Sequence, residues 1–373
     1  MTGREVATGF DDLCCRHTQA LEVGPRSAHL HGILIASLQR VQRMTPNARI
    51  YIAGHSGLVG SALCRALAAA CYTHLITRTH AELDLTDAQA TEAFFAREKP
   101  EYVFIAAARV GGILANNEFP ADFIRDNLAI ETNLITAAHR HGAARLLFFG
   151  ASCIYPKFAE QPIREDSLLT GPLEATNRPY ALAKIAGIEM CWSYNRQHGT
   201  RFLSVMPASA YGPNDNFSPE NSHVLPALIR RFTEAARDRA ESVTLWGTGT
   251  ALREFLYSDD LADACLFLMN LDDAAFDDLL GKGIDHQKVF QPPLINIGSG
   301  TDLPISQLAA RIARLAGFEG RIDYDTSKPD GTPRKLLDNA RIAALGWQPK
   351  VSLDAGLRLT MDHYLATPGQ GRR

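Results

Sequence analysis

The sequence lacks several features that would assign the protein to a specialised class. No run of about 18 apolar residues occurs, so we expect no helix that spans a bilayer. The seven cysteines are scattered and odd in number, which fits neither a disulfide framework nor a zinc site, and we expect no metal. A formal net charge of only −3 gives no reason to expect binding to nucleic acid or to an anionic membrane surface. Internal repeats and low-complexity tracts are also absent from the sequence.

What remains is the composition of an ordinary globular chain. The 373 residues are 46% hydrophobic and 21% charged, which is typical of soluble proteins and long enough for about two domains. Because a disulfide framework is missing, we expect a cytoplasmic protein. Residues 1–43 show no sustained hydrophobic period, and we expect a disordered extension there. The alternative is a helix over residues 28–43 that packs on the first domain.

Apolar strand patterns alternate with helical patterns over the first half of the chain. Strands are predicted at residues 49–53, 74–77, 101–105, 145–149 and 201–206. This alternation predicts an α/β fold with a Rossmann-type, doubly wound parallel sheet, in which ligands gather at the carboxyl ends of the strands. We expect this domain to span residues 44–212. Residues 213–366 are expected to form mainly a smaller substrate-binding domain with segments that return to the first, and 367–373 a tail. Residues 271–292 resemble an acidic, loosely ordered loop.

A glycine-rich turn joins the first strand to the first helix. It has the spacing Gly-x-x-Gly-x-x-Gly and comprises Gly54, His55, Ser56, Gly57, Leu58, Val59 and Gly60. A strand, a glycine turn and a helix in this order form the context of a dinucleotide-binding site. Glycines let the backbone approach a pyrophosphate, which rests on the N-terminus of the helix. The alternative is a tight turn without a ligand.

The end of the second strand indicates which dinucleotide binds. An NAD site usually carries an acidic residue there for the ribose 2′-hydroxyl, whereas this sequence has Arg78. A guanidinium pairs well with a 2′-phosphate, so we expect NADP(H) as the cofactor. Asp84 and Leu85 follow and could flank the adenine. The alternative for Arg78 is a solvated surface arginine.

Tyr180 and Lys184 form a candidate acid–base pair. Pro179 marks the start of a helix, and residues four apart on a helix lie on one face. An ammonium beside a phenol is expected to stabilise the phenolate and to lower its pKa. The motif is common by chance, and an exposed amphipathic pair is the alternative.

Together these motifs resemble the extended short-chain dehydrogenase/reductases. Within them the chain is similar to the epimerase-reductases that convert GDP-4-keto-6-deoxy-D-mannose to GDP-L-fucose, from about residue 49 to residue 364. The resemblance rests on the segments IAGHSGLVG (52–60), VGGILANN (110–117), SCIYP (152–156), PYALAKIAG (179–187), NSHV (221–224) and KPDGTPRK (328–335). The segments SCIYP, NSHV and KPDGTPRK are the most discriminating.

The resemblance implies a role for each matching residue. Tyr180 and Lys184 would be the catalytic pair, with Lys184 also on the nicotinamide ribose, and Cys153 and His223 the acid–base groups of epimerisation, as thiolate and imidazole. The further cofactor contacts would be Pro207, Ala210 and His223, and the substrate contacts Arg231, Trp246, Arg253 and Asp330. The resemblance also implies a homodimer, formed through helices around residues 122–141 and 181–198.

Each residue also has an ordinary structural explanation, and two positions depart from the family pattern. A cysteine such as Cys153 is often a small buried hydrophobe, His223 could cap a helix, and Trp246 could belong to the core. Ala151 stands where the superfamily has a Ser or Thr that donates to the substrate oxygen, and Ser209 stands where Asn is usual. Two alternatives therefore stay open, namely another NADP-dependent nucleotide-sugar epimerase or reductase of the same superfamily and a weakly active binding protein.

Overall fold

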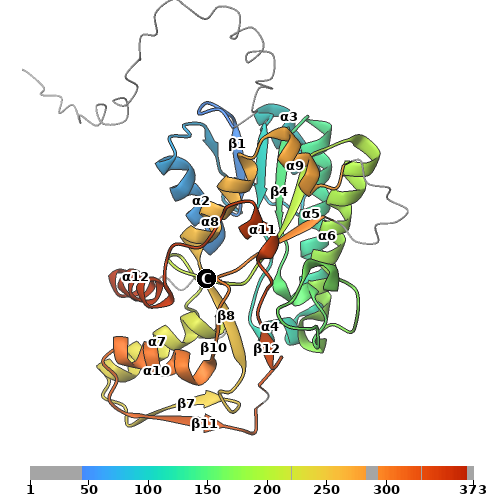
Figure 1. Cartoon of the computed structure of the whole chain (residues 1–373). Helices are drawn as coiled ribbons and strands as arrows, with labels where there is room; N and C mark the ends of the chain where they lie inside the picture. Colours follow the sequence, from blue (N-terminus) through green and yellow to red (C-terminus); the bar gives the residue numbers. More distant parts are fainter. Residues whose placement is uncertain (1–43, 220, 283–292, 329, 368–373) are drawn as a thin grey trace, which may run out of the picture. The chain divides into compact units, whose positions relative to one another are not determined.

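Six parallel strands form the main sheet, in the order β2-β1-β3-β4-β5-β9 (Figure 1). The strands are β1 (Ile50–Ala53), β2 (Leu75–Ile76), β3 (Tyr102–Ile105), β4 (Arg145–Phe149), β5 (Phe202–Pro207) and β9 (Leu294–Ile297). The order reverses at β1, because β2 and β3 lie on either side of it, and such a reversal opens a ligand crevice at the carboxyl ends. This computed structural model describes residues 44–219, 221–282, 293–328 and 330–367.

Helices cover both faces of this sheet. The helix α5 (Pro120–Arg140) packs on α3 (Ala88–Glu98) and on α6 (Arg178–His198), and α2 (Leu58–Ala69) packs on α8 (Ser258–Met269) (Figure 1). The five strands β1, β3, β4, β5 and β9 are almost entirely buried because helices lie on both sides, which is why they are runs of apolar residues. The predicted Rossmann-type, doubly wound sheet is therefore confirmed.

A second apolar cluster lies among elements from the later part of the chain. Its helices are α7 (Val224–Arg237), α10 (Ile305–Leu315) and α12 (Leu353–Ala366). Its strands are β6 (Ser209–Tyr211), β7 (Ser242–Trp246), β8 (Leu252–Tyr257), β10 (Asp302–Pro304), β11 (Arg321–Asp325) and β12 (Arg334–Lys335). Here β8 pairs with β6, β10 and β12, whereas β7 and β11 form a separate parallel ribbon. The shorter elements are α4 (Ile113–Glu118), α9 (Asp273–Leu279), α11 (Ala340–Ala344), η1 (Ser152–Ile154), η2 (Glu165–Ser167) and η3 (Ala175–Asn177).

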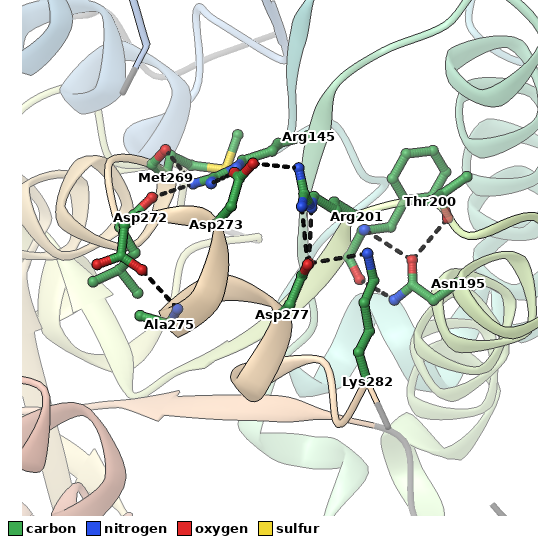
Figure 2. Close-up of polar contacts among 12 residues, drawn as sticks. Arg145, Asn195, Thr200, Arg201, Met269, Asp272, Asp273, Ala275, Asp277 and Lys282 are labelled. Atoms are coloured by element: carbon green, nitrogen blue, oxygen red, sulfur yellow. Dashed lines mark hydrogen bonds and ion pairs between the residues drawn. The ribbon is translucent and has the colours of Figure 1, made fainter. Parts of the chain in front are cut away.

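The prediction of an acidic loop from residue 271 is wrong for its first part, which contains the helix α9. Asp273 accepts ion pairs from Arg145 at 2.6 Å and from Arg201 at 2.9 Å, and Asp277 pairs with Arg201 at 2.8 Å and with Lys282 at 2.9 Å (Figure 2). Arg145 begins β4 and Arg201 precedes β5, so the acidic side chains dock α9 on the amino ends of two strands. The acidic residues are thus neutralised by partners far away in the sequence.

Several sequence predictions lie outside the described residues. These are the extension over residues 1–43, the tail from residue 368 and the loop over 283–292. Strand bounds agree with prediction to within one or two residues, and β9 shows that the chain returns to the first sheet after entering the second cluster. In the part of the chain that the structure describes, no helix is both long and apolar enough to cross a membrane.

Candidate active site

The turn between β1 and α2 requires glycine at two positions. Gly54 has a φ of +80°, and a Cβ there would lie 2.7 Å from the backbone nitrogen of Ala107. A Cβ at Gly60 would lie 2.1 Å from the carbonyl oxygen of Gly54. Among the described residues, no side chain caps the N-terminus of α2. Nδ1 of His55 is buried in the turn and has no hydrogen-bond partner among these residues. The turn therefore fits an anionic group at the helix N-terminus.

Arg78 follows β2, as predicted, but it has an acidic partner that the sequence did not reveal. Its guanidinium donates to the carboxylate of Glu98 at 2.7 Å and to the carbonyl of Thr77 at 2.6 Å, and it lies 5.4 Å from the ring centre of Phe94. The side chain keeps 30% of its surface exposed. A guanidinium has five N–H donors, so these two bonds leave donors for a phosphate.

The roles of the remaining predicted cofactor residues stay predictions. The carboxylate of Asp84 accepts from the backbone and the hydroxyl of Thr86, which holds the pKa of Asp84 below its usual value. Leu85 is the next residue along the chain. Pro207 ends β5, and Ala210 lies in β6, which pairs with β8.

Tyr180 and Lys184 lie near the start of α6, which begins at Arg178 as Pro179 predicted. The Lys184 ammonium is 5.9 Å from the ring centre of Tyr180. The expectation of a lowered phenol pKa is not met, because burial raises the pKa of Tyr180 well above its usual value. Neighbouring Cys153 and Glu131 raise this pKa further. Tyr180 is therefore a protonated acid at neutral pH.

Cys153 and His223 come together with Lys335 from β12. Burial raises the pKa of the Cys153 thiol and lowers that of the His223 imidazole, and the Lys335 charge lowers both, which places its ammonium near both groups. The expected thiolate is thus a neutral thiol. Cys153 and Lys335 are partly exposed and His223 is exposed, so solvent reaches all three side chains. We call this group, together with the partly exposed Tyr180, the cysteine recess.

The structure also decides between alternatives for these residues. His223 directly precedes α7, but its side chain makes no capping hydrogen bond, so it does not cap the helix. Cys153 is only partly buried and lies close enough to Tyr180 to raise the phenol pKa. Trp246 is 62% exposed, which excludes a place in the core. All three side chains are therefore available to a ligand.

The predicted substrate residues lie in the second cluster. Arg231, on α7, donates to the carbonyl of Thr244, and burial lowers the pKa of Arg231. Arg253 lies on β8, with a charge that acts on both Lys335 and Asp330. These electrostatic contacts connect Arg253 to the recess that contains Cys153.

Asp330 has a structural role that the sequence did not predict. Its carboxylate accepts from the backbone of Thr248 at 2.7 Å and from the hydroxyl of the same residue at 2.9 Å. These bonds fix the turn after Trp246, whose ring also lies 5.6 Å from the Lys328 ammonium. A direct bond from Asp330 to a substrate remains a prediction.

Sequence reasoning missed two charged residues of the site. Lys335 ends the KPDGTPRK segment, but the resemblance implied no role for it. Glu131 of α5 lies 3.0 Å from Lys184. A signal for Glu131 was present, because it interrupts the apolar stripe that contains Leu134 and Ile135. Among the described residues no cluster of His, Cys, Asp or Glu could hold a metal ion.

A Rossmann-type sheet with a glycine turn, a Tyr–Lys pair and a cysteine recess defines a dinucleotide-dependent enzyme of the short-chain dehydrogenase/reductase type. The chain belongs to the NAD dependent epimerase/dehydratase family, whose model matches residues 50–278. The resemblance found in the sequence is thereby confirmed.

Individual relatives are similar over most of their length. The chain is 56% identical to GDP-L-fucose synthase 1 of Arabidopsis thaliana, over 86% of this chain and 94% of that protein. It is 51% identical to GDP-L-fucose synthase of Escherichia coli (strain K12), over 85% and 96%. Among solved structures, a GDP-mannoheptose C4 reductase from Campylobacter jejuni with NADP bound is 37% identical, with a TM-score of 0.76 and coverage of 86% and 99%.

Proposed function

We propose that this protein is an NADPH-dependent epimerase-reductase that converts GDP-4-keto-6-deoxy-D-mannose to GDP-L-fucose. The observation that carries the proposal is the position of Cys153. Its thiol lies close enough to Tyr180 and to Lys335 to interact with both, and Lys335 also acts on His223. One recess thus contains the acid for a reduction and a second proton-transfer pair for epimerisation.

The second pair suits inversion next to a ketone. A 4-keto group acidifies the protons on carbons 3 and 5, and inversion needs one group to remove a proton and another to return it on the opposite face. A neutral Cys153 thiol and a neutral His223 imidazole carry one transferable proton between them. His223 can therefore take a proton while Cys153 gives one, and the resulting imidazolium and thiolate can act in the reverse direction at the second carbon. Lys335 supplies positive charge near the enolate.

The reduction uses Tyr180 as the acid. NADPH, when bound, supplies the hydride that carbon 4 accepts. The Tyr180 hydroxyl gives its proton to oxygen 4, and the phenolate regains a proton from solvent through the open recess. The glycine turn with Gly54 and Gly60 fits the pyrophosphate and Arg78 the 2′-phosphate, whereas a bond from Lys184 to the nicotinamide ribose stays a prediction, because its side chain is 2% exposed and paired with Glu131. The NADP-bound relative supports this choice of cofactor.

The second cluster would hold the GDP moiety. The exposed Trp246 ring can stack on the base or the ribose, and Arg231 and Arg253 can pair with the diphosphate. Asp330 would accept from the guanine edge with the lone pairs that Thr248 leaves free. We further propose a cytoplasmic homodimer formed through α5 and α6, since Leu182 of α6 is 42% exposed. Light scattering tests the oligomeric state.

The test of the reaction is the identity of the product. Purified protein, GDP-4-keto-6-deoxy-D-mannose and NADPH should yield GDP-L-fucose, identified by NMR. Reduction without inversion would indicate a C4 reductase like the Campylobacter relative. An unchanged ketone, with NADPH still bound, would indicate the weakly active binding protein that Ala151 suggests.

A further inference from the structure

Two charged side chains meet inside the seam between α5 and α6. Oε1 of Glu131 lies 3.0 Å from Nζ of Lys184, and the side chains are only 1% and 2% exposed. Their neighbours on the buried face of α5 include Leu134 and Ile135. A buried ion pair commonly adds little stability compared with apolar residues of the same volume, so packing alone does not explain this pair.

The helix α6 leaves a space for the carboxylate. Gly187 is three residues after Lys184, and a Cβ there would lie 2.8 Å from Oε2 of Glu131 and 2.4 Å from the Phe148 ring. The same Phe148 ring lies 4.7 Å from the Lys184 ammonium. Glycine at position 187 and the aromatic ring thus fit the carboxylate and the ammonium into one tight space, which holds both in place.

The charge of this pair reaches the reacting phenol. The titratable groups whose charges raise the pKa of Tyr180 are Cys153 from η1 and Glu131 from α5, while the Lys184 ammonium on its own helix lies 5.9 Å from the ring centre. The thiol of Cys191, on the buried face of α6, also faces the ion pair. Burial raises the pKa of this thiol, so the thiol stays protonated. Glu131 is therefore the acidic residue among the described residues whose charge acts on Tyr180.

We propose that Glu131 is a positioning residue that holds the Lys184 ammonium and offsets part of its charge, so that Tyr180 stays a protonated phenol. This inference rests on the proposed reduction, in which Tyr180 must give a proton. An ammonium without a counter-ion would stabilise the phenolate and so lower the pKa of the acid that the reaction uses. Burial raises the pKa of Glu131 and Lys184 lowers it, so the two residues act as a coupled pair.

The test is a spectroscopic titration of Tyr180 that needs no substrate. Phenolate absorbance near 295 nm would be followed against pH, and the signal of Tyr180 isolated by subtracting the Tyr180→Phe variant. In E131Q the phenolate should appear at lower pH than in the unmodified protein, by about one pH unit, the effect expected from loss of a nearby negative charge. The alkaline limb of NADPH-dependent reduction should move by the same amount.

Two further variants make the outcome decisive. E131D keeps the charge but withdraws it by one methylene, so the phenolate should appear at an intermediate pH, and this variant serves if E131Q does not fold. E92Q removes a carboxylate of α3 that pairs with His141, the residue directly after α5, and it should leave the titration unchanged. Unshifted or raised phenolate formation in E131Q, or in E131D where E131Q does not fold, would overturn the proposal. A protein that titrates as expected but does not reduce the ketone would refute the proposed reaction alone.

Discussion

The guanidinium of Arg78 lies 2.7 Å from the carboxylate of Glu98, which comes from α3, 20 residues further along the chain. The ion pair and the Phe94 ring fix the direction of the arginine. Because both partners are 22–30% exposed, the pair adds little to stability. Its consequence is instead that a cation is held in place at the end of β2, where the cofactor ribose is expected.

Replacing this cation should change the cofactor preference. Arg78→Ala should lower the affinity for NADPH by about 1–3 kcal/mol, the value of a charge-assisted bond, and leave the affinity for NADH nearly unchanged. Arg97→Ala is the matched control, because Arg97 contacts the same Glu98 and the same Phe94 ring but is 64% exposed. Equal losses for NADPH and NADH, measured by calorimetry, would contradict a 2′-phosphate contact.

Much of the site could be predicted because its signals are local. The glycine turn and the Tyr180–Lys184 pair each lie within a few residues, so spacing reveals them. Glu131 and Lys335 reach the site from elements far from it in the sequence, and only the fold brings them near Lys184 and Cys153. Spacing cannot show burial either, and burial is the main reason why the pKa of Tyr180 is raised instead of lowered.

The fold was predictable to a similar degree and for the same reason. Buried parallel strands are continuous apolar runs and can be identified directly. The helix α9 was mistaken for a loop because acidic composition suggests solvent exposure, whereas Asp273 and Asp277 are paired with Arg145 and Arg201. Partners more than 70 residues away leave no local pattern.

The Asp273 contacts should contribute measurably to stability. Arg145 is 3% exposed, and Asp273→Asn leaves its guanidinium without its anionic partner. We expect a loss of about 2–4 kcal/mol in the free energy of unfolding, measured in urea. Asp238→Asn is the control, because its pair with Arg237 is exposed at the surface, and it should change the free energy of unfolding much less. Equal effects of the two variants would argue against a role for the network in Figure 2.

The pH dependence of proton exchange at carbons 3 and 5 should reflect Cys153 and His223. Burial lowers the pKa of His223, so the acid limb should lie below about pH 6.5, and burial raises that of Cys153, so the alkaline limb should lie above about pH 8.5. Lys335 lowers both pKa values, so Lys335→Met should move both limbs to higher pH. Limbs that stay in place, or move to lower pH, would show that Lys335 does not act on the pair.

The missing hydroxyl at Ala151 should limit the reduction. Ala151 has an extended backbone and directly precedes η1, which packs on α6. Ser152 lies within η1 and so follows a different backbone direction. Ala151→Ser should raise the rate of NADPH oxidation by about tenfold or more, since a donor to a developing oxyanion is typically worth at least that. An unchanged or slower rate would mean that another group already supplies this hydrogen bond.

The central claim is that one recess contains two separate proton-transfer systems, one for epimerisation and one for reduction. The most direct test uses the Tyr180→Phe variant with GDP-4-keto-6-deoxy-D-mannose and NADPH in D2O. NMR should show deuterium at carbons 3 and 5, while NADPH oxidation falls by about 100-fold or more. Cys153→Ala should show the opposite defect, with little deuterium incorporated at carbons 3 and 5. Two results in Tyr180→Phe would contradict this separation. One is that deuterium exchange and reduction are both lost, and the other is that reduction proceeds at the unmodified rate.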